Sequence, residues 1–190
     1  MITKSEQAEL QLQRYKTMTP TDMDTLQEEE LFPKFVEKHL RLQSEHKKKD
    51  VRKLMALIYI TYLMRFKKAP KKSLDSEEEI ATHLYNAPLV VQERFLEEFT
   101  EVEEGESTQR RMISSKNKDK LISYILVLSL FVEDFQLDPS LITADLQENT
   151  TKINDHLRAL GCEMTNTKEG RQAALKAPLK FPKPRLFKRT

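Results

Sequence analysis

Residues 151–158 of this sequence combine side chains that bind nucleic acids. Lys152 and Arg158 can reach phosphates or the acceptor atoms of bases, and Asn154 can pair with adenine. Thr151 can contact a phosphate near the start of a helix. Asp155 counts against close insertion into a DNA groove, because its carboxylate repels phosphates. We predict a DNA-contacting helix face here, and the alternative is an ordinary solvated face with surface charges.

Further basic residues flank this stretch and extend the same hypothesis. Lys168 and Arg171 lie on either side of a polar turn, and Lys116, Lys118 and Lys120 lie close together upstream. The C-terminal tail adds the basic residues Lys180, Lys183, Arg185, Lys188 and Arg189. Cations of this kind bind duplex DNA by releasing its counterions, which makes binding salt-dependent and largely independent of sequence. The alternative is a basic, solvated tail without a ligand.

No arrangement of residues in the sequence is typical of an enzyme active site. The four histidines lie in separate segments, and no HExxH, GxxxxGK[ST], GxGxxG or GxSxG motif occurs. Cys162 is expected to be a small buried residue rather than a reactive thiol. We therefore predict a protein that is not an enzyme, with no cofactor, no metal and no small-molecule substrate.

The composition favours helices and an intracellular location. The chain has 190 residues, of which 38% are hydrophobic and 33% charged, with only 3 Gly and no Trp. A single cysteine cannot form an internal disulfide, and no apolar stretch approaches the roughly 20 residues that a membrane helix needs. The N-terminus is polar and lacks the apolar region of a signal peptide. We expect no membrane contact.

The segments around residue 150 predict how the DNA-contacting face is presented. Two short apolar-periodic segments, 141–146 and 153–160, are separated by a short polar stretch that leaves room only for a tight turn. Asn149 or Thr150 can cap the second helix, and Gly161 can take the left-handed conformation that ends it. Two helices joined in this way form a helix-turn-helix, whose second helix can lie in a DNA major groove.

The whole pattern occurs twice in the chain. Setting Leu54 against Leu121 aligns LMALIYITYLM with LISYILVLSLF. Setting Leu84 against Leu146 aligns EIATHLYNAPLVVQERFLEEF with LITADLQENTTKINDHLRALG in their apolar positions. A two-stranded ribbon with its turn at Gly170 is expected to follow the second unit as a wing. The predicted fold class is mainly α, a tandem winged helix with two helix-turn-helix units, each with a small β-wing, after a partly helical linker.

The two units differ in charge. The predicted divisions are a linker or anchor segment at 1–46, a first winged helix at 47–112, a second at 113–182 and a basic tail at 183–190. Residues 110–190 hold 15 Lys or Arg against 9 Asp or Glu, whereas residues 1–109 hold 17 against 21. The DNA-facing surface is therefore expected in the second unit, and the first unit is expected to be a scaffold or to face other proteins.

The apolar stripe of each second helix predicts which of its side chains reach solvent. Ile153, Leu157 and Leu160 would face inward, which leaves all five polar candidates between Thr151 and Arg158 outward. The corresponding helix of the first unit would expose a face that repels DNA, made of Gln92, Glu93, Glu97 and Glu98.

Five ordered segments resemble a known family. They are EEELFP, LMALIYITYL, LISYILVLSLFVEDFQLD, LRALGCEM and LKAPLKFPKPR. Together they resemble the C-terminal tandem winged-helix domain of the forty-nine-kilodalton subunit of RNA polymerase I, called polymerase-associated factor in animals, over about residues 26–185. The start of the sequence is similar to the linker that follows the family's dimerisation module.

The resemblance implies a non-catalytic, accessory subunit of a DNA-directed RNA polymerase, in the nucleus and nucleolus. Its partners would be double-stranded DNA and other RNA polymerase I subunits, and it would support initiation and elongation of ribosomal RNA transcription. The family's DNA contacts would map onto the basic residues Lys152, Arg158, Lys168 and Arg171.

Two other readings of the sequence stay open. A tandem winged helix can be a protein–protein docking module without direct DNA binding, and the acidic first unit fits that function. A sequence-specific repressor would need dimers and spaced half-sites, and the sequence contains no obvious dimerisation helix. A steep loss of DNA affinity with salt distinguishes phosphate binding from docking through apolar patches.

Overall fold

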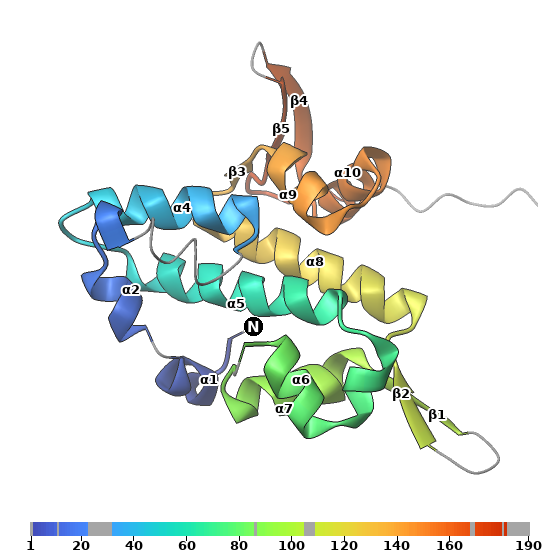
Figure 1. The fold of residues 1–190 in the computed structure, drawn as a ribbon. Helices are drawn as coiled ribbons and strands as arrows, with labels where there is room; N and C mark the ends of the chain where they lie inside the picture. The colour runs from blue at the N-terminus through green and yellow to red at the C-terminus, as the bar shows by residue number, and fades with distance from the viewer. Residues whose placement is uncertain are drawn as a thin grey trace, which may run out of the picture.

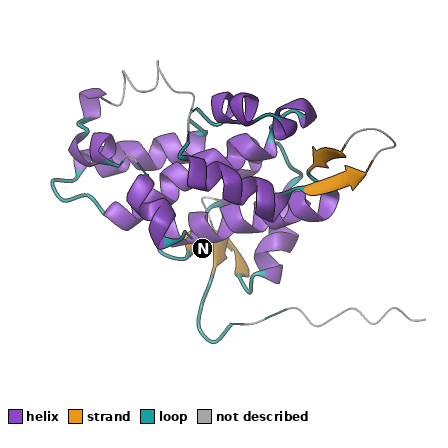
Figure 2. Ribbon diagram, turned by 90° about the horizontal axis from the view of Figure 1, so that it is seen from below, coloured by secondary structure: helices purple, strands orange, loops and turns teal. Residues whose placement is uncertain are grey.

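The computed structural model describes residues 2–10, 12–22, 32–85, 87–104, 109–167, 170–179 and 181. The chain is mainly helical, with two small antiparallel sheets at separate places (Figure 2). In chain order, the described elements are α1 (Lys4–Glu9), α2 (Gln13–Thr17), α4 (Lys34–Glu45), α5 (Val51–Lys67), the 3₁₀ helix η1 (Lys71–Asp75), α6 (Glu77–His83), α7 (Leu89–Phe99), β1 (Glu101–Glu104), β2 (Gln109–Met112), α8 (Ser115–Val132), β3 (Gln136–Leu137), α9 (Pro139–Leu146), α10 (Thr150–Ala159), β4 (Glu163–Thr167) and β5 (Gly170–Ala174).

Helices α5 and α8 lie side by side at the centre of the molecule (Figure 1). Each begins at a side chain that caps the first turn, Asp50 for α5 and Ser114 for α8. Each is apolar on most sides because other elements cover it, with α4 and α2 packing on α5 and with α7 and α10 packing on α8. In the described part of the chain, no helix is long and apolar enough to cross a membrane.

The predicted repeat is present in the structure. Helices α5, α6 and α7 are followed by a β-hairpin, and α8, α9 and α10 are followed by another. Ser76 and Asp138, which are equivalent positions of the repeat, each cap the short helix of their unit. Tyr85 (φ 52°) and Gln147 (φ 53°), another equivalent pair, are both left-handed in the turn between the second and third helices. The same backbone turn therefore joins the same helices in both units.

The two sheets differ in size. Strands β1 and β2 form an antiparallel pair in the first unit, with Glu103 opposite Arg110. Residues 105–108, between these two strands, lie outside the described residues. In the second unit, β4 and β5 form the expected ribbon, and the two-residue strand β3 pairs with β5 to give the order β3-β5-β4. Strand β3 was not predicted because so short a strand leaves no periodic signal.

The N-terminal residues pack on both units. Phe35, Val36 and Leu40 of α4 are fully buried. Asp145 of α9 accepts hydrogen bonds from the backbone amides at the start of α4, Lys34 N (3.0 Å) and Phe35 N (2.9 Å). The sequence did not predict that α1 and α2 also join the core, through the buried residues Leu10, Leu12, Tyr15 and Met18.

A buried carboxylate attaches α1 to the first unit. Glu6 is fully buried and accepts hydrogen bonds from the Tyr59 hydroxyl (2.6 Å), the Thr3 amide (2.6 Å) and the Arg94 guanidinium. Burial alone would raise the pKa of Glu6, but the hydrogen bonds from Tyr59 and Thr3 and the charge of Arg94 outweigh it and lower the pKa. Arg94 also pairs with Glu98 on α7 (3.2 Å).

Replacing this carboxylate should destabilise the fold. Glu6→Gln removes the charge that pairs with Arg94, and we expect the free energy of unfolding at pH 7 to fall by roughly 2–4 kcal/mol in urea unfolding. Because the folded pKa of Glu6 lies below its ordinary value of 4.5, its contribution is present above the pKa of the unfolded chain and is lost as pH falls through the folded pKa. The variant should therefore lose less stability than the parent on acidification below about pH 4.5.

Glu9→Gln provides the matched control, since Glu9 is exposed on the same helix. A Glu6→Gln variant as stable as Glu9→Gln would contradict a structural function for the buried carboxylate.

Candidate nucleic-acid interface

Helix α10 is held in place by its cap and by its apolar face. The Asn149 side chain accepts a hydrogen bond from the Thr151 amide (2.8 Å), which confirms Asn149 as the cap. Ile153 and Leu157 are fully buried, and α10 contacts α8, α9 and β4. The helix ends at Ala159 with Leu160 as its C-cap, and Gly161 follows in the predicted left-handed conformation with φ 95°.

The prediction that Asn154 faces outward is wrong. Its side chain is only 2% exposed, and its Oδ1 has no hydrogen-bond partner among the described residues. The cause is the width of the buried face, because α10 packs against both α8 and α9 and so buries more than a single apolar stripe. In this position Asn154 cannot pair with a base.

The same correction applies to α7. Gln92, which is the equivalent of Asn154 in the first unit, was expected to be exposed but is buried, and its amide donates to the Ala87 carbonyl (2.6 Å). The third helix of each unit therefore buries one amide side chain beside its apolar stripe. Glu93 and Glu97 are exposed as predicted, and Glu98 is half-buried.

Lys152 lies between two carboxylates. Its Nζ is 2.9 Å from Asp119 Oδ1 on α8 and 3.5 Å from Glu148 Oε2 in the turn. Glu148 also pairs with Lys67 of α5 (2.8 Å), which connects the second unit to the first. The hydrogen bond with Asp119 raises the pKa of Lys152 and lowers the pKa of Asp119. The charge of Lys152 is thus matched inside the molecule.

The remaining polar residues of α10 are more accessible. Thr151 is exposed, and so is Arg158, whose guanidinium donates to Asp155 (2.8 Å) one turn earlier. An exposed ion pair of this kind contributes little to stability, so a phosphate can replace the carboxylate at small cost. His156, on the flank of α10, is within hydrogen-bonding distance of the Ser123 hydroxyl (3.0 Å).

The three lysines at the start of α8 have different environments. Lys116 and Lys118 are exposed and have no ion-pair partner among the described residues. Lys120, in contrast, pairs with Glu98 of α7 (3.3 Å) and lies 5.2 Å from the centre of the Phe99 ring. Lys120 therefore braces α8 against the first unit, and only the two earlier lysines are free to meet an anion.

The ribbon contributes one described cation. Arg171 on β5 is exposed, and its Nε is 3.4 Å from Asn166 Oδ1 on β4. Lys168 lies outside the described residues, as do Lys180, Lys183, Arg185, Lys188 and Arg189 of the tail.

These contacts define one candidate surface, made of the first turn of α8, the exposed side of α10 and the ribbon. The Lys152–Asp119 pair brings the start of α10 to the start of α8, and β4 packs on α10. The surface holds Lys116, Lys118, Thr151, Lys152, Arg158 and Arg171. Some cations of this surface have no carboxylate partner among the described residues. They lie on α8 and the ribbon rather than on α10.

Other chemistry finds no support in the described residues. They contain no group of three or more His, Cys, Asp or Glu side chains that could hold a metal ion. Cys162 is buried, as predicted, and burial raises the pKa of its thiol, which disfavours the reactive thiolate.

The structure defines a mainly helical protein in which the order of three helices and a hairpin occurs twice, with a polar face on α10. Comparison with known proteins gives its family: residues 1–182 match the family described as A49-like RNA polymerase I associated factor, and the chain belongs to that family. It is 31% identical over 151 residues to the DNA-directed RNA polymerase I subunit rpa49 of Schizosaccharomyces pombe. That match covers 72% of this chain and 35% of the relative, so the chain spans about a third of the relative's length.

The inward position of Asn154 predicts how it responds to substitution. Asn154→Leu replaces a buried amide, whose oxygen has no partner in the described structure, by an apolar side chain of similar volume. We expect the free energy of unfolding to stay equal or to rise by about 1 kcal/mol in urea unfolding. Ala159→Leu, at an exposed position of α10, controls for helix propensity. A decrease above about 1 kcal/mol relative to that control would show that the amide is hydrogen-bonded in solution.

Proposed function

We propose that this chain is a tandem winged-helix module that binds duplex DNA as part of the RNA polymerase I machinery. The observation that carries the proposal is the order α8-β3-α9-α10-β4-β5, in which a helix-turn-helix is followed by a ribbon that extends beside the second helix (Figure 1). The first unit has the same helix order and a shorter hairpin. We keep the divisions 47–112 and 113–182 for the two units, with 1–46 as the anchor segment and 183–190 as the basic tail.

The family membership supports the setting that we propose for this module. The chain would be a non-catalytic, accessory part of a polymerase I subunit, nuclear and nucleolar, that supports initiation and elongation of ribosomal RNA transcription. Its partners would be double-stranded DNA and other polymerase I subunits. A module that holds DNA beside a polymerase slows dissociation and needs no chemistry of its own.

The charges of the candidate surface suggest how DNA is held. Lys116, Lys118 and Arg171 can meet phosphates directly, and Arg158 can exchange Asp155 for a phosphate. Lys152 contributes only after it separates from Asp119 and Glu148. Because Asn154 is buried, α10 has no amide free to read an adenine, which favours binding with little sequence preference. Lys168 stays part of the proposal on sequence grounds alone.

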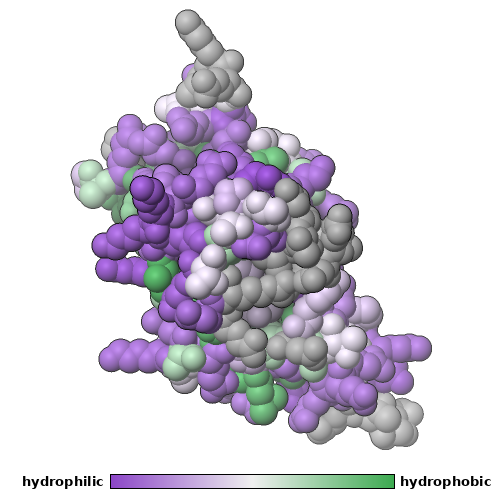
Figure 3. Space-filling view, turned by 60° about the vertical axis from the view of Figure 1, so that its left-hand side comes forward, coloured by the Kyte–Doolittle hydropathy of each residue, from purple (hydrophilic) through white to green (hydrophobic). Residues whose placement is uncertain are grey.

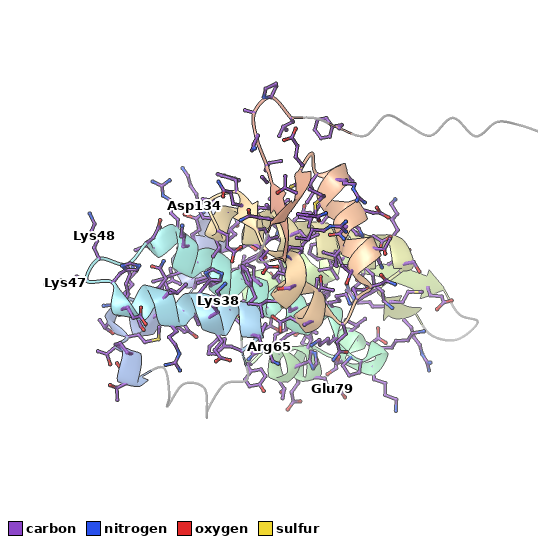
Figure 4. All side chains as sticks on the ribbon, turned by 90° about the horizontal axis from the view of Figure 1, so that it is seen from above. Lys38, Lys47, Lys48, Arg65, Glu79 and Asp134 are labelled. Carbon is purple, nitrogen blue, oxygen red and sulfur yellow. The ribbon has the colours of Figure 1, made fainter. Side chains whose placement is uncertain are left out.

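The direct test measures fluorescence anisotropy of a labelled random duplex across a salt series. Removing one phosphate contact should reduce the slope of log K against log[salt] by about 0.9, so we expect Lys116→Ala/Lys118→Ala/Arg171→Ala to reduce it by about 2–3. Lys47→Ala/Lys48→Ala is the matched control, because these exposed lysines lie at a remote end of the molecule (Figure 4). An equal reduction in the control would show that net charge, rather than this surface, governs binding.

The ion pairs of α10 predict gains of affinity from single changes. Asp119→Asn leaves Lys152 with one carboxylate partner, and Asp155→Asn frees Arg158. We expect each change to tighten duplex binding about two- to fivefold at low salt, since each removes one negative charge beside a phosphate contact. Glu93→Gln, an equal charge change on the exposed side of α7, should leave the affinity unchanged. If all three variants bind alike, α10 does not face DNA.

One observation favours a second function, protein docking by the first unit. The exposed side of α7 carries Glu93 and Glu97 together with Leu89, which is 58% exposed. Carboxylates repel DNA, whereas such a mixed face suits a protein partner. A chain that binds no duplex at low salt, while it still binds polymerase I, would make docking the main function.

A further inference from the structure

A cleft separates the two helix-turn-helix turns. It has a volume of about 1030 Å³ and is bounded by the start of α4, the end of α5, the end of α6 and the end of α9. Arg65, labelled in Figure 4, lies in its wall, and the two left-handed turn residues, Tyr85 and Gln147, both line it. The repeat therefore brings the equivalent turns of both units to one hollow. The volume is at the upper end of the range found for ligand sites.

Tyr85 presents an aromatic ring in this cleft. Its side chain is 50% exposed, although large aromatic side chains are usually mostly buried. The Arg65 guanidinium lies 3.6 Å from the centre of the ring and so covers one of its faces. The left-handed turn does not demand an aromatic residue, because Gln147 adopts the same conformation in the second unit. The turn geometry therefore does not account for an aromatic side chain at this position. The Arg65 guanidinium stacks on the ring and fixes its orientation.

The charged groups of the cleft favour an anionic ligand. Lys34 and Lys68 are exposed, line the cleft and have no ion-pair partner among the described residues. Asp145 is the one carboxylate in the described lining, and both of its oxygens already accept hydrogen bonds from the amides that begin α4. A ligand with a negative charge therefore meets three cations, Lys34, Lys68 and the Arg65 guanidinium, and a carboxylate that is already hydrogen-bonded.

An aromatic platform beside two lysines fits a base and its flanking phosphates. Bases stack on aromatic side chains in proteins that bind single strands, while a basic rim follows the backbone. The bases of a duplex are stacked on one another, whereas a single strand leaves the faces of its bases free to stack on a ring. We propose that the cleft between the two units binds single-stranded nucleic acid, with a base stacked on Tyr85 and phosphates at Lys34 and Lys68. The proposal rests on the proposed function only in taking nucleic acid as the partner.

Anisotropy of labelled oligo(dT) of twelve nucleotides tests this proposal, with the random duplex measured in parallel. Tyr85→Asn removes the ring and keeps a residue that tolerates the left-handed turn. Removing one stacked base should weaken oligo(dT) binding about 5- to 100-fold, and Lys34→Ala/Lys68→Ala should weaken it and lower its salt dependence. Duplex affinity should change less than twofold in each.

Phe135→Asn is the matched control. Phe135 is also an exposed aromatic residue (47%) in the left-handed conformation (φ 66°), but it does not line the cleft. It should alter the binding of neither ligand. Oligo(dT) affinity that is unchanged by Tyr85→Asn, or that falls equally with Phe135→Asn, would overturn the proposal. The proposal would also be overturned if oligo(dT) does not bind while an acidic, tyrosine-containing peptide does, and if that peptide binding depends on Tyr85.

The two proposals fail separately in this design. If the chain binds no duplex but binds oligo(dT) through Tyr85, the duplex-binding proposal is wrong and the cleft proposal is supported. If duplex binding depends on Lys116, Lys118 and Arg171 while Tyr85→Asn leaves oligo(dT) binding intact, the cleft proposal is wrong and the proposed function is supported.

Discussion

The packing of α5 against α8 is the contact on which the rest of the structure depends. Each helix is the first of its unit, and each buries apolar side chains on most of its surface, so neither can be stable without the other elements around it. The buried residues form a continuous core from Leu10 to Ala173. The two units therefore share one interior, and the candidate surface on α10 is fixed relative to the acidic face on α7. On the face drawn in Figure 3, the coloured surface is largely hydrophilic, with small hydrophobic patches.

Ion pairs within the molecule reduce the number of basic side chains that are available to bind DNA. Lys152 looks like a DNA contact in the sequence, yet it is held between Asp119 and Glu148, and Lys120 is held by Glu98. Only cations without such partners offer their full charge to a polyanion. On the candidate surface those cations lie at the start of α8 and on the ribbon, so the expected DNA contact moves away from the face that α10 alone would suggest.

Local signals predicted much of the fold. Apolar periodicity located α5, α7, α8 and α10, and the cap residue Asn149 located the start of α10, because these effects act within a few residues of the chain. The burial of α1 in the core was missed because it depends on contacts of Glu6 with Tyr59 and Arg94, far away in sequence. The position of Asn154 was wrong for a related reason, since the width of the buried face is set by two neighbouring helices.

The candidate site was less predictable than the fold. The sequence identified Lys116, Lys118, Arg158 and Arg171 as cations, but it could not show that Asp119 would neutralise Lys152, because that pair joins two helices. The sequence alone also did not predict the cleft, since Tyr85 and Gln147 line one hollow only when the repeated units pack together. The sequence does place Tyr85 and Gln147 at equivalent positions of the repeat. That equivalence points to the cleft only together with the structure, in which both turns are left-handed.

The central claim is that duplex DNA meets the surface formed by α8, α10 and the ribbon. Backbone amide chemical shifts of the isotopically labelled chain, titrated with a random duplex at low salt, test it most directly. We expect the largest shifts at residues 115–118, 150–152 and 165–171, with small shifts along α7. Shifts concentrated on α6 and α7, or no shifts at all, would contradict this account.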